Sequence, residues 1–202
     1  MITTDFVTAW ITRFGELIQE NQAMLTELDS PIGDADHGGN MARGMSAAVP
    51  ALTEAANLEA QLKGLGMTML SKVGGTSGPL YGTFFLKAAK ELGSQTEVSD
   101  EVFISALRAG LDGLIGRGKA ELGDKTMVDA ITPAIEALEA AGDVEHGATK
   151  ALEAAEAGRD ATTPMLAKKG RASYLGDRSI GHQDPGATSA TMLFEALAGV
   201  VA

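Results

Sequence analysis

Three carboxylates fall within eight residues of one another in the first fifth of the chain. They belong to Asp29, Asp34 and Asp36, and the nearest cationic side chain along the sequence is Arg43. Carboxylates held this close repel one another unless a cation neutralises them. Because the chain contains no Cys, an all-oxygen ligand set favours magnesium, calcium or manganese over zinc. The pattern predicts a magnesium site that a ligand's phosphates would complete; the alternative is a turn in which Asp36 or Asn40 caps the following helix.

A second candidate site is the glycine-rich stretch GGTSGP, from 74 to 79. The hydroxyls of Thr76 and Ser77 and a flexible backbone come just before a helix that Pro79 can start. The N–H groups at a helix N-terminus attract phosphate, so this stretch is a candidate phosphate cradle. An ordinary turn between two helices is the competing interpretation.

The stretch GKAELGDKT, from 118 to 126, has the glycines and lysine of a Walker A motif but not their spacing. An Asp separates the second Gly from Lys125, and no strand precedes the motif, so we reject a P-loop. What remains is a turn that offers the Gly118 backbone, Lys125 and Thr126 near a helix start. The competing interpretation makes Asp124 a helix cap.

The strongly basic part of this acidic chain runs from 168 to 186. The cationic side chains of its first eleven residues are Lys168, Lys169, Arg171 and Arg178. Four cations at this density suit a polyphosphate ligand, and a solvated surface loop is the alternative. His37 and His182 lie in glycine-rich loops and are candidates for nucleotide or phosphoryl contacts, whereas His146 is expected on an exposed helix face.

Helices must position these stretches. Apolar residues recur at three-and-four spacing from 5 to 28, which predicts one long helix there. Weaker patterns of the same kind predict further helices at 41–56, 58–73, 79–92, 99–117, 126–140, 145–168 and from 186 to the end. Because no linker, tandem repeat or low-complexity tract interrupts them, the sequence predicts a single all-α domain over 1–202. Its eight or so helices are expected to pack as antiparallel neighbours in a bundle or barrel.

The glycines indicate where the loops of this domain lie. Seventeen of the 25 Gly fall in four windows, at 33–44, 74–82, 110–123 and 170–186. Gly is unfavourable inside helices, so these windows mark loops and helix ends. If the helices alternate up and down, such loops gather at one end and form a site from distant segments.

The overall composition excludes several classes of function. Acidic residues outnumber basic ones by 27 to 16, and the formal net charge of −11 argues against binding nucleic acid or an anionic membrane. The absence of Cys excludes disulfides and thiolate metal sites. The first residues lack the features of a signal peptide, and no stretch approaches the ~18 apolar residues of a membrane span. We therefore expect a cytoplasmic protein with no membrane partner.

Taken in order, the motifs resemble those of the L subunit of dihydroxyacetone kinase. The match spans essentially the whole chain and rests on GDADHGGNM (33–41), VGGTSGPL (73–80), GKA (118–120), GDKTM (123–127), KGRASYLG (169–176) and GHQDPG (181–186). The resemblance implies an eight-helix antiparallel barrel of up-and-down topology, with the nucleotide held across the loops at one end. Ala35 stands where many relatives have Gly.

The same resemblance implies a set of site residues. It implies that Asp29, Asp34 and Asp36 bind two magnesium ions that bridge the phosphates of ADP or ATP. It also implies catalytic roles for His37 and Arg171, beside the three metal-binding carboxylates. The residues that it places around the nucleotide are His37, Gly38, Gly39, Asn40, Thr76, Ser77, Gly118, Met127, Arg171, Asp184, Pro185 and Gly186.

The activity implied by the resemblance is that of a phosphoenolpyruvate-dependent dihydroxyacetone phosphotransferase, or glycerone kinase. In this family a separate K subunit holds dihydroxyacetone on a His, and the L subunit supplies the nucleotide half of the active site. In the bacterial phosphotransferase-system enzymes, ADP stays bound and is recharged to ATP by a phosphohistidine of an M subunit. Because no substrate domain is attached to this sequence, we expect this type.

Three alternatives stay open beside it. The first is an ATP-dependent dihydroxyacetone kinase subunit with exchangeable ATP, an arrangement in which both domains are usually fused. The second is a fatty acid kinase, a class that carries extra domains after the nucleotide domain. The third is a nucleotide-sensing module that binds a transcription regulator, a role that some L subunits combine with catalysis.

Overall fold

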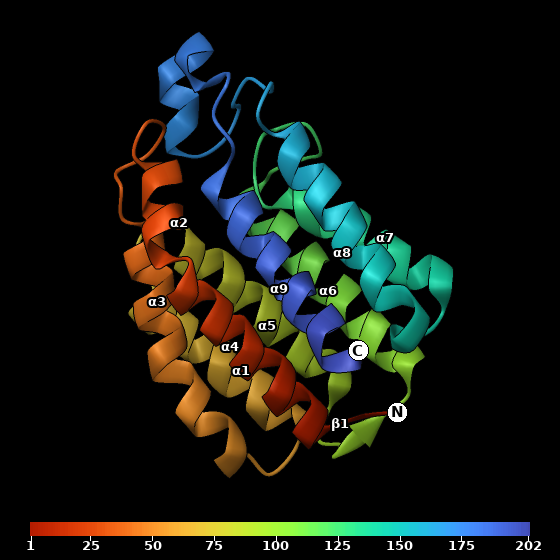
Figure 1. The fold of residues 1–202 in the computed structure, drawn as a ribbon. Coiled ribbons are helices and arrows are strands. Elements are labelled where there is room, and N and C mark those ends of the chain that lie inside the picture. Colours follow the sequence, from red (N-terminus) through yellow and green to blue (C-terminus); the bar gives the residue numbers. More distant parts are fainter.

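The computed structural model describes every residue from Met1 to Ala202, and helices make up most of the protein (Figure 1). The nine α-helices are α1 (Thr4–Glu20), α2 (Gln22–Asp29), α3 (His37–Ala48), α4 (Leu58–Lys72), α5 (Ser77–Leu92), α6 (Asp100–Gly118), α7 (Val128–Ala141), α8 (Val144–Ala161) and α9 (Pro185–Val201). The shorter elements are the 3-10 helices η1 (Val49–Glu54) and η2 (Arg171–Ser179) and the antiparallel strands β1 (Ile2–Thr3) and β2 (Glu97–Val98). The predicted all-α class is confirmed. None of these helices combines the length and apolar character needed to cross a membrane.

The count of eight helices was wrong by one, because the predicted helix at 5–28 is two helices. Asn21 ends α1, and its side-chain Nδ2 donates to the Leu17 carbonyl at 2.9 Å. Asn side chains compete in this way with the backbone hydrogen bonds of a helix. The predicted helix at 145–168 is also shorter and ends at Ala161. Pro164 follows closely, and a proline disfavours helical backbone at the residue before it.

The helices contact one another in an order that returns to its start. Neighbours in this circuit are α1, α3, α4, α5, α6, α7, α8 and α9, and α9 packs again on α1. Helix α2 continues beyond α1 and packs on α3 and α9. One continuous hydrophobic core joins them, with Trp10 and Tyr81 among its largest fully buried side chains. The Trp10 indole Nε1 donates to the Leu193 carbonyl at 2.8 Å and so ties α1 to α9 across this core.

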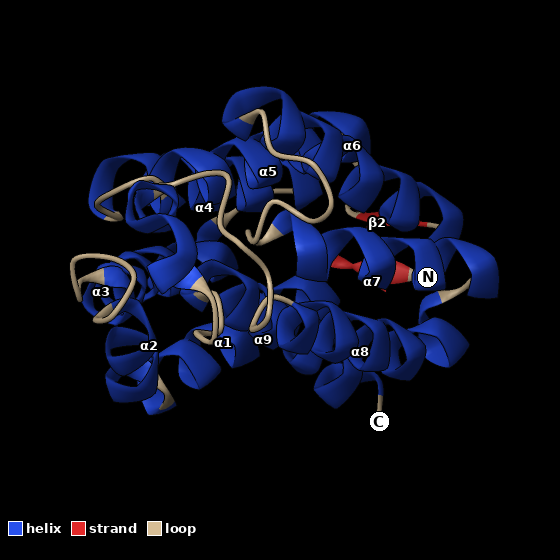
Figure 2. Ribbon diagram, turned by 90° about the horizontal axis from the view of Figure 1, so that it is seen from above, coloured by secondary structure: helices blue, strands red, loops and turns tan.

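The direction of the helices brings the glycine-rich loops to one end. Helices α3, α5, α7 and α9 begin at this end, whereas α2, α4, α6 and α8 finish there. The loops lie over the helix ends in the view from above (Figure 2), with η2 as the outermost element in Figure 1. Segments far apart in the sequence therefore meet around one pocket.

Candidate functional site

One pocket at this end collects most of the residues that the motifs singled out. Of the fifteen predicted site residues, the thirteen that line it are Asp29, Asp34, Asp36, His37, Asn40, Thr76, Ser77, Gly118, Met127, Arg171, Asp184, Pro185 and Gly186. The other two, Gly38 and Gly39, lie in the first turn of α3 without lining the pocket. Gly38 packs against α2, where an added Cβ would lie 2.1 Å from the Gln22 carbonyl oxygen.

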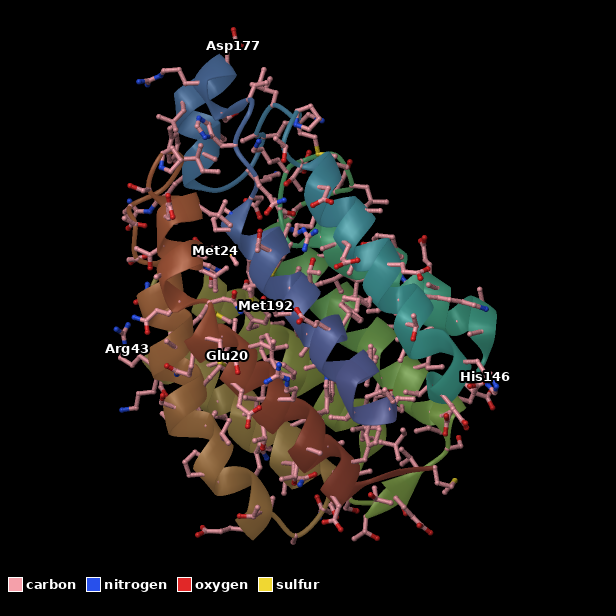
Figure 3. The ribbon with its side chains drawn as sticks, in the orientation of Figure 1. Glu20, Met24, Arg43, His146, Asp177 and Met192 are labelled. Atoms are coloured by element: carbon pink, nitrogen blue, oxygen red, sulfur yellow. The ribbon has the colours of Figure 1, made fainter.

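The two remaining His lie elsewhere. His182 does not line the pocket, although it falls in the loop that leads to α9. His146 is exposed on α8, as expected, and pairs with Asp143 in the same helical turn. Figure 3 shows it far from Asp177 of η2.

Four helices begin at the pocket, and three of them are not capped by the side chain of their own Ncap residue. The first N–H groups of α3 and α7 are held instead by the side chains of Asp29 and Thr126. The Ncap positions of α3, α5 and α7 make no side-chain hydrogen bond to the helix, whereas α9 is capped by Asp184. By contrast, α1, α4, α6 and α8 all begin at the opposite end, and each has a capping side chain. Helix N-termini carry partial positive charge and N–H groups that need acceptors. The pocket therefore concentrates the anion-binding ends of the bundle.

The three carboxylates lie close together at the N-terminus of α3. One carboxylate oxygen from each of Asp29, Asp34 and Asp36 lies within 4.8 Å of the others. Asp29 is only 8% exposed, and its Oδ2 accepts from the backbone N–H groups of Asp36 (2.9 Å) and His37 (3.2 Å). Burial, followed by repulsion from Asp36, raises the pKa of Asp34. This all-oxygen donor set fits a divalent cation such as Mg²⁺, which would relieve the repulsion.

The backbone between these carboxylates has no room for a side chain at Gly33. A Cβ at this position would lie 1.9 Å from Asp29 Oδ1, so the carboxylate occupies the space that a side chain would take. Two residues later, Ala35 has a φ of 58°, in the left-handed region that Gly adopts without strain. The left-handed backbone explains why Gly would be favoured at this position.

The basic segment crosses the pocket mouth, and only part of it faces inward. Arg171 Nη2 lies 2.7 Å from Asp34 Oδ2, and Lys169 also lines the pocket. Lys168 instead faces Asp124, at 3.7 Å, and Arg178 lies in η2 away from the lining. The cluster of four cations predicted for a polyphosphate therefore divides into two at the pocket and two outside it. Lys169 was predicted as one of the four polyphosphate-binding cations but was not in the set of site residues that the resemblance implied, although it lies within the matching motif.

The turn at 118–127 is held by buried ionic groups. Lys125 is 1% exposed, and its Nζ donates to the carbonyls of Thr162 (2.8 Å), Met165 (3.1 Å) and Thr163 (3.3 Å). Burial lowers the pKa of this ammonium group. All three ammonium protons thus form hydrogen bonds to the segment that follows α8. Lys125 therefore holds in place the chain that leads into the basic segment at 168–186.

Asp129 stabilises the same turn from α7. Its carboxylate accepts from the backbone N–H groups of Gly123 (2.6 Å) and Thr126 (2.8 Å). The interpretation of Asp124 as the cap of α7 was wrong, because its Oδ2 accepts from the Glu121 N–H within the turn. The sequence analysis did not single out Asp129, because its role depends on how the turn before α7 folds back against the first turn of that helix.

His37 lines the pocket, but hydroxyl groups hold both of its ring nitrogens. Nδ1 lies 3.0 Å from Ser77 Oγ, and Nε2 lies 2.9 Å from Ser189 Oγ. Ser189 Oγ in turn lies 2.8 Å from the Tyr81 hydroxyl. Burial lowers the pKa of His37, against the attraction of Asp29 and Asp36. Ser189 and Tyr81 were missed, because they lie in apolar helices and their only sequence signal is a polar residue on a buried face.

The fold and the site together define an all-helical protein with a pocket suited to a phosphate-bearing ligand and a divalent cation. The chain belongs to the DAK2 domain family, which it matches over residues 31–199. It is 48% identical over 198 residues to the ADP-binding subunit DhaL of the PEP-dependent dihydroxyacetone kinase of Escherichia coli (strain K12), covering 95% of this chain and 94% of that protein. It is 46% identical to the DhaL subunit of the PTS-dependent kinase of Lactococcus lactis, over 100% of both chains.

A solved structure of a dihydroxyacetone kinase is also similar to this chain. The crystal structure of the dihydroxyacetone kinase of C. freundii in complex with AMP-PNP and Mg²⁺ aligns with a TM-score of 0.77 and 28% sequence identity. The alignment covers 96% of this chain and 34% of that larger chain, so this protein corresponds to about a third of it. The family resemblance drawn from the motifs is confirmed.

Proposed function

We propose that this chain is the ADP-binding subunit of a PEP-dependent dihydroxyacetone kinase. The observation that carries the proposal is the convergence of Asp29, Asp34 and Asp36 within 4.8 Å of one another, in a pocket where four helix N-termini meet. Relatives at 46–48% identity over nearly their whole length are named as ADP-binding subunits of such kinases. The main hydrophobic core, to which all nine α-helices contribute, supports treating 1–202 as one nucleotide-binding domain.

In this proposal the three carboxylates hold two Mg²⁺ ions. Magnesium, when bound, neutralises the phosphate charge that otherwise opposes phosphoryl transfer. The side chain of Arg171, at the pocket mouth beside Asp34, adds a positive charge next to the metal-binding carboxylates. The carboxylates and the cation thus supply positioning and charge, which is most of what this reaction needs.

The remaining residues bind and orient the nucleotide. The hydroxyls of Thr76 and Ser77, at the start of α5, bind phosphate oxygens, and the N–H groups of Gly38 and Gly39 contribute the positive end of α3 behind the pocket lining. Met127, with Leu80 and Leu114, gives the pocket an apolar wall suited to the nucleoside. The other residues assigned to nucleotide binding are Asn40, Gly118, Asp184, Pro185 and Gly186, all of which line the pocket.

The partners follow from this role. We infer a dihydroxyacetone-binding K subunit as the acceptor side and a phosphohistidine-bearing M subunit of a phosphotransferase system as the donor side. The names of the relatives, which specify PEP-dependent and PTS-dependent kinases, support this pair. Such a phosphoryl relay operates in the cytoplasm, where phosphoenolpyruvate is made. A transcription regulator that senses the nucleotide state is a further partner that this role would allow.

Substitution of the carboxylates tests the proposal. Asp34→Asn and Asp36→Asn are each expected to abolish dihydroxyacetone phosphate formation in an assay with the K subunit, the M subunit and its phosphoryl donors. Asp177→Asn is the matched control, because Asp177 is an exposed acid of η2 outside the pocket. Unchanged transfer in both variants would contradict the metal assignment. Loss of transfer with retained partner binding would support the enzymatic role over a purely sensing one.

Mass spectrometry of the purified protein tests the mode of nucleotide use. ADP that remains stoichiometrically bound through dialysis would support the permanent cofactor. Rapid release, with many turnovers from ATP when only the K subunit is added, would favour the ATP-dependent alternative.

A further inference from the structure

A chain of four hydrogen-bonding groups runs from the hydrophobic core to the phosphate end of the pocket. It consists of Tyr81, Ser189, His37 and Ser77, joined at 2.8, 2.9 and 3.0 Å. Tyr81 and Ser189 are completely buried, His37 is 6% exposed, and half-buried Ser77 begins α5 at the pocket. Tyr81 and Ser189 do not line the pocket, so any effect that they have on a ligand must pass through His37 and Ser77.

The available donors and acceptors determine the direction of the hydrogen bond between Tyr81 and Ser189. Ser189 Oγ is the acceptor within reach of the buried Tyr81 hydroxyl, so Tyr81 donates to Ser189. Ser189 has one proton, which it can give either to the Gly186 carbonyl at 3.1 Å or to Nε2 of His37. A neutral imidazole has one N–H and one acceptor nitrogen, so this choice sets the tautomer of His37.

In the first arrangement Ser189 donates to Gly186. Nε2–H of His37 then donates to Ser189 Oγ, and Nδ1 accepts the hydroxyl proton of Ser77. Every donor in the chain has a partner within the protein. Ser77 presents only lone pairs to the pocket, which a phosphate oxygen cannot use.

In the second arrangement Ser189 donates to Nε2 of His37. The ring proton lies on Nδ1 and is donated to Ser77 Oγ, which leaves the Ser77 hydroxyl proton free to point into the pocket. The bond from Ser189 to Gly186 is lost, so this arrangement becomes favourable only when an acceptor is present in the pocket. Both arrangements hold the same four protons, and only the ring proton changes its atom.

We propose that Tyr81, Ser189 and His37 are positioning residues that aim the hydroxyl proton of Ser77 at a phosphate oxygen of the bound nucleotide. The inference rests on the proposed function and deepens it, since the ligand is the Mg²⁺ complex of a nucleoside diphosphate. When bound, its phosphate accepts from Ser77 and selects the second arrangement. All hydrogen bonds then run in one direction from Tyr81 to the ligand, which strengthens each of them.

Tyr81 has a predictable influence in this arrangement. Ser189 Oγ accepts from both Tyr81 and His37 in the first arrangement but only from Tyr81 in the second. Tyr81→Phe therefore leaves Ser189 without a donor only in the ligand-bound arrangement. Loss of one hydrogen bond corresponds to an increase of about five-fold in the Kd for Mg·ADP. The buried ring, which packs against Phe14 and Phe85, is retained in the variant.

The test combines the tautomer of His37 with binding affinity. Long-range proton–nitrogen NMR of the ¹⁵N-labelled full chain distinguishes Nε2–H from Nδ1–H, and the signal absent from His37→Asn identifies His37 among three His. We expect Nε2–H in nucleotide-free protein and Nδ1–H with saturating Mg·ADP. Tyr81→Phe should bind about five-fold more weakly, by calorimetry, with an incomplete change of tautomer.

Thr191→Val is the matched control. Its buried hydroxyl lies on α9, like that of Ser189, but it contacts only the carbonyls of Ala155 and Ala187. It should change neither the tautomer nor the Kd. Equal losses of affinity in Tyr81→Phe and Thr191→Val would contradict the proposed role of the hydrogen-bond chain. Binding of Mg·ADP while the His37 ring remains in the Nε2–H tautomer would contradict it as well.

Magnesium pyrophosphate separates this inference from the proposed function. A change of tautomer with pyrophosphate but no binding of ADP would support the relay and contradict the assigned nucleotide. Binding of ADP without the change would support the nucleotide and overturn the relay. If neither compound binds, both proposals fail.

Discussion

Replacement of Asp184 by Asn is expected to stabilise the protein above neutral pH and to leave its stability unchanged in acid. Asp184 caps α9, where its Oδ2 accepts from the Ala187 N–H at 2.7 Å. Burial, followed by the nearby carboxylates of Asp129 and Asp29, raises the pKa of Asp184 to about 7. Asn retains an oxygen acceptor for the same cap and carries no charge.

The magnitude follows from the two pKa values of Asp184. Between the ordinary pKa of 3.8 and about 7, the native side chain keeps a proton that the unfolded chain has released, so the free energy of unfolding falls as pH rises. Below pH 3.8, Asp184 is protonated in both the native and the unfolded state, so it does not change the free energy of unfolding. Above a pH of about 7 it is ionised in both states, and the native state bears the full cost of the buried charge. A gap of about three pH units corresponds to about 4 kcal/mol at most. Because Asp184 lines the open pocket and part of the residue is exposed to water there, we expect a smaller gain of about 2 kcal/mol at alkaline pH.

Urea unfolding at about pH 4, 6 and 8, in chelator and without nucleotide, measures the effect. Asp143→Asn is the control, because Asp143 caps α8 in the same way but is exposed, and hydrogen bonds from His146 lower its pKa. The control should gain no stability as the pH rises. If Asp184→Asn instead loses the same stability at every pH, Asp184 is ionised in the native state and the reasoning is wrong.

Three further substitutions test the local geometry of the site. Ala35→Gly should raise the free energy of unfolding by about 0.5–1 kcal/mol, because a φ of 58° strains the backbone of Ala but not of Gly. A lower free energy of unfolding in urea would show that Ala35 is not strained. Lys125→Met should lower the free energy of unfolding by about 2 kcal/mol by leaving carbonyls such as that of Thr162 unpaired, and a change below about 0.5 kcal/mol would show that Nζ contributes little. Gly33→Ala should weaken Mg·ADP binding at least about ten-fold in calorimetry, because its Cβ would displace the Asp29 carboxylate, and unchanged affinity would argue against Asp29 as a ligand.

The parts of the site that the sequence predicted are local in the chain. Asp29, Asp34 and Asp36 are close in sequence, so any turn between α2 and α3 brings their carboxylates together. The glycine-rich loops were also recognisable, because Gly at helix ends has a direct conformational reason. Alternating helix direction then suffices to place these loops at one end.

The parts that the sequence did not predict depend on contacts between distant segments. Ser189 is 152 residues from His37, and nothing in either local pattern specifies their contact. Lys125 was interpreted from a phosphate-loop pattern, yet its direction is set by carbonyls that follow α8. The break at Asn21 was missed because the apolar stripe continues across it, and periodicity records the buried face rather than the backbone path.

The distribution of helix caps resolves an apparent conflict in charge. A protein with a formal net charge of −11 should repel a polyphosphate. At the pocket, however, four helix N-termini stand beside Arg171 and Lys169, and the first turn of α5 has no side-chain acceptor, unlike the helices that begin at the opposite end. The missing cap of α5 costs about 1 kcal/mol of local helix stabilisation and leaves N–H donors for a ligand. With two divalent cations on the three carboxylates, beside Arg171 and Lys169, the local charge becomes positive where the phosphates would lie.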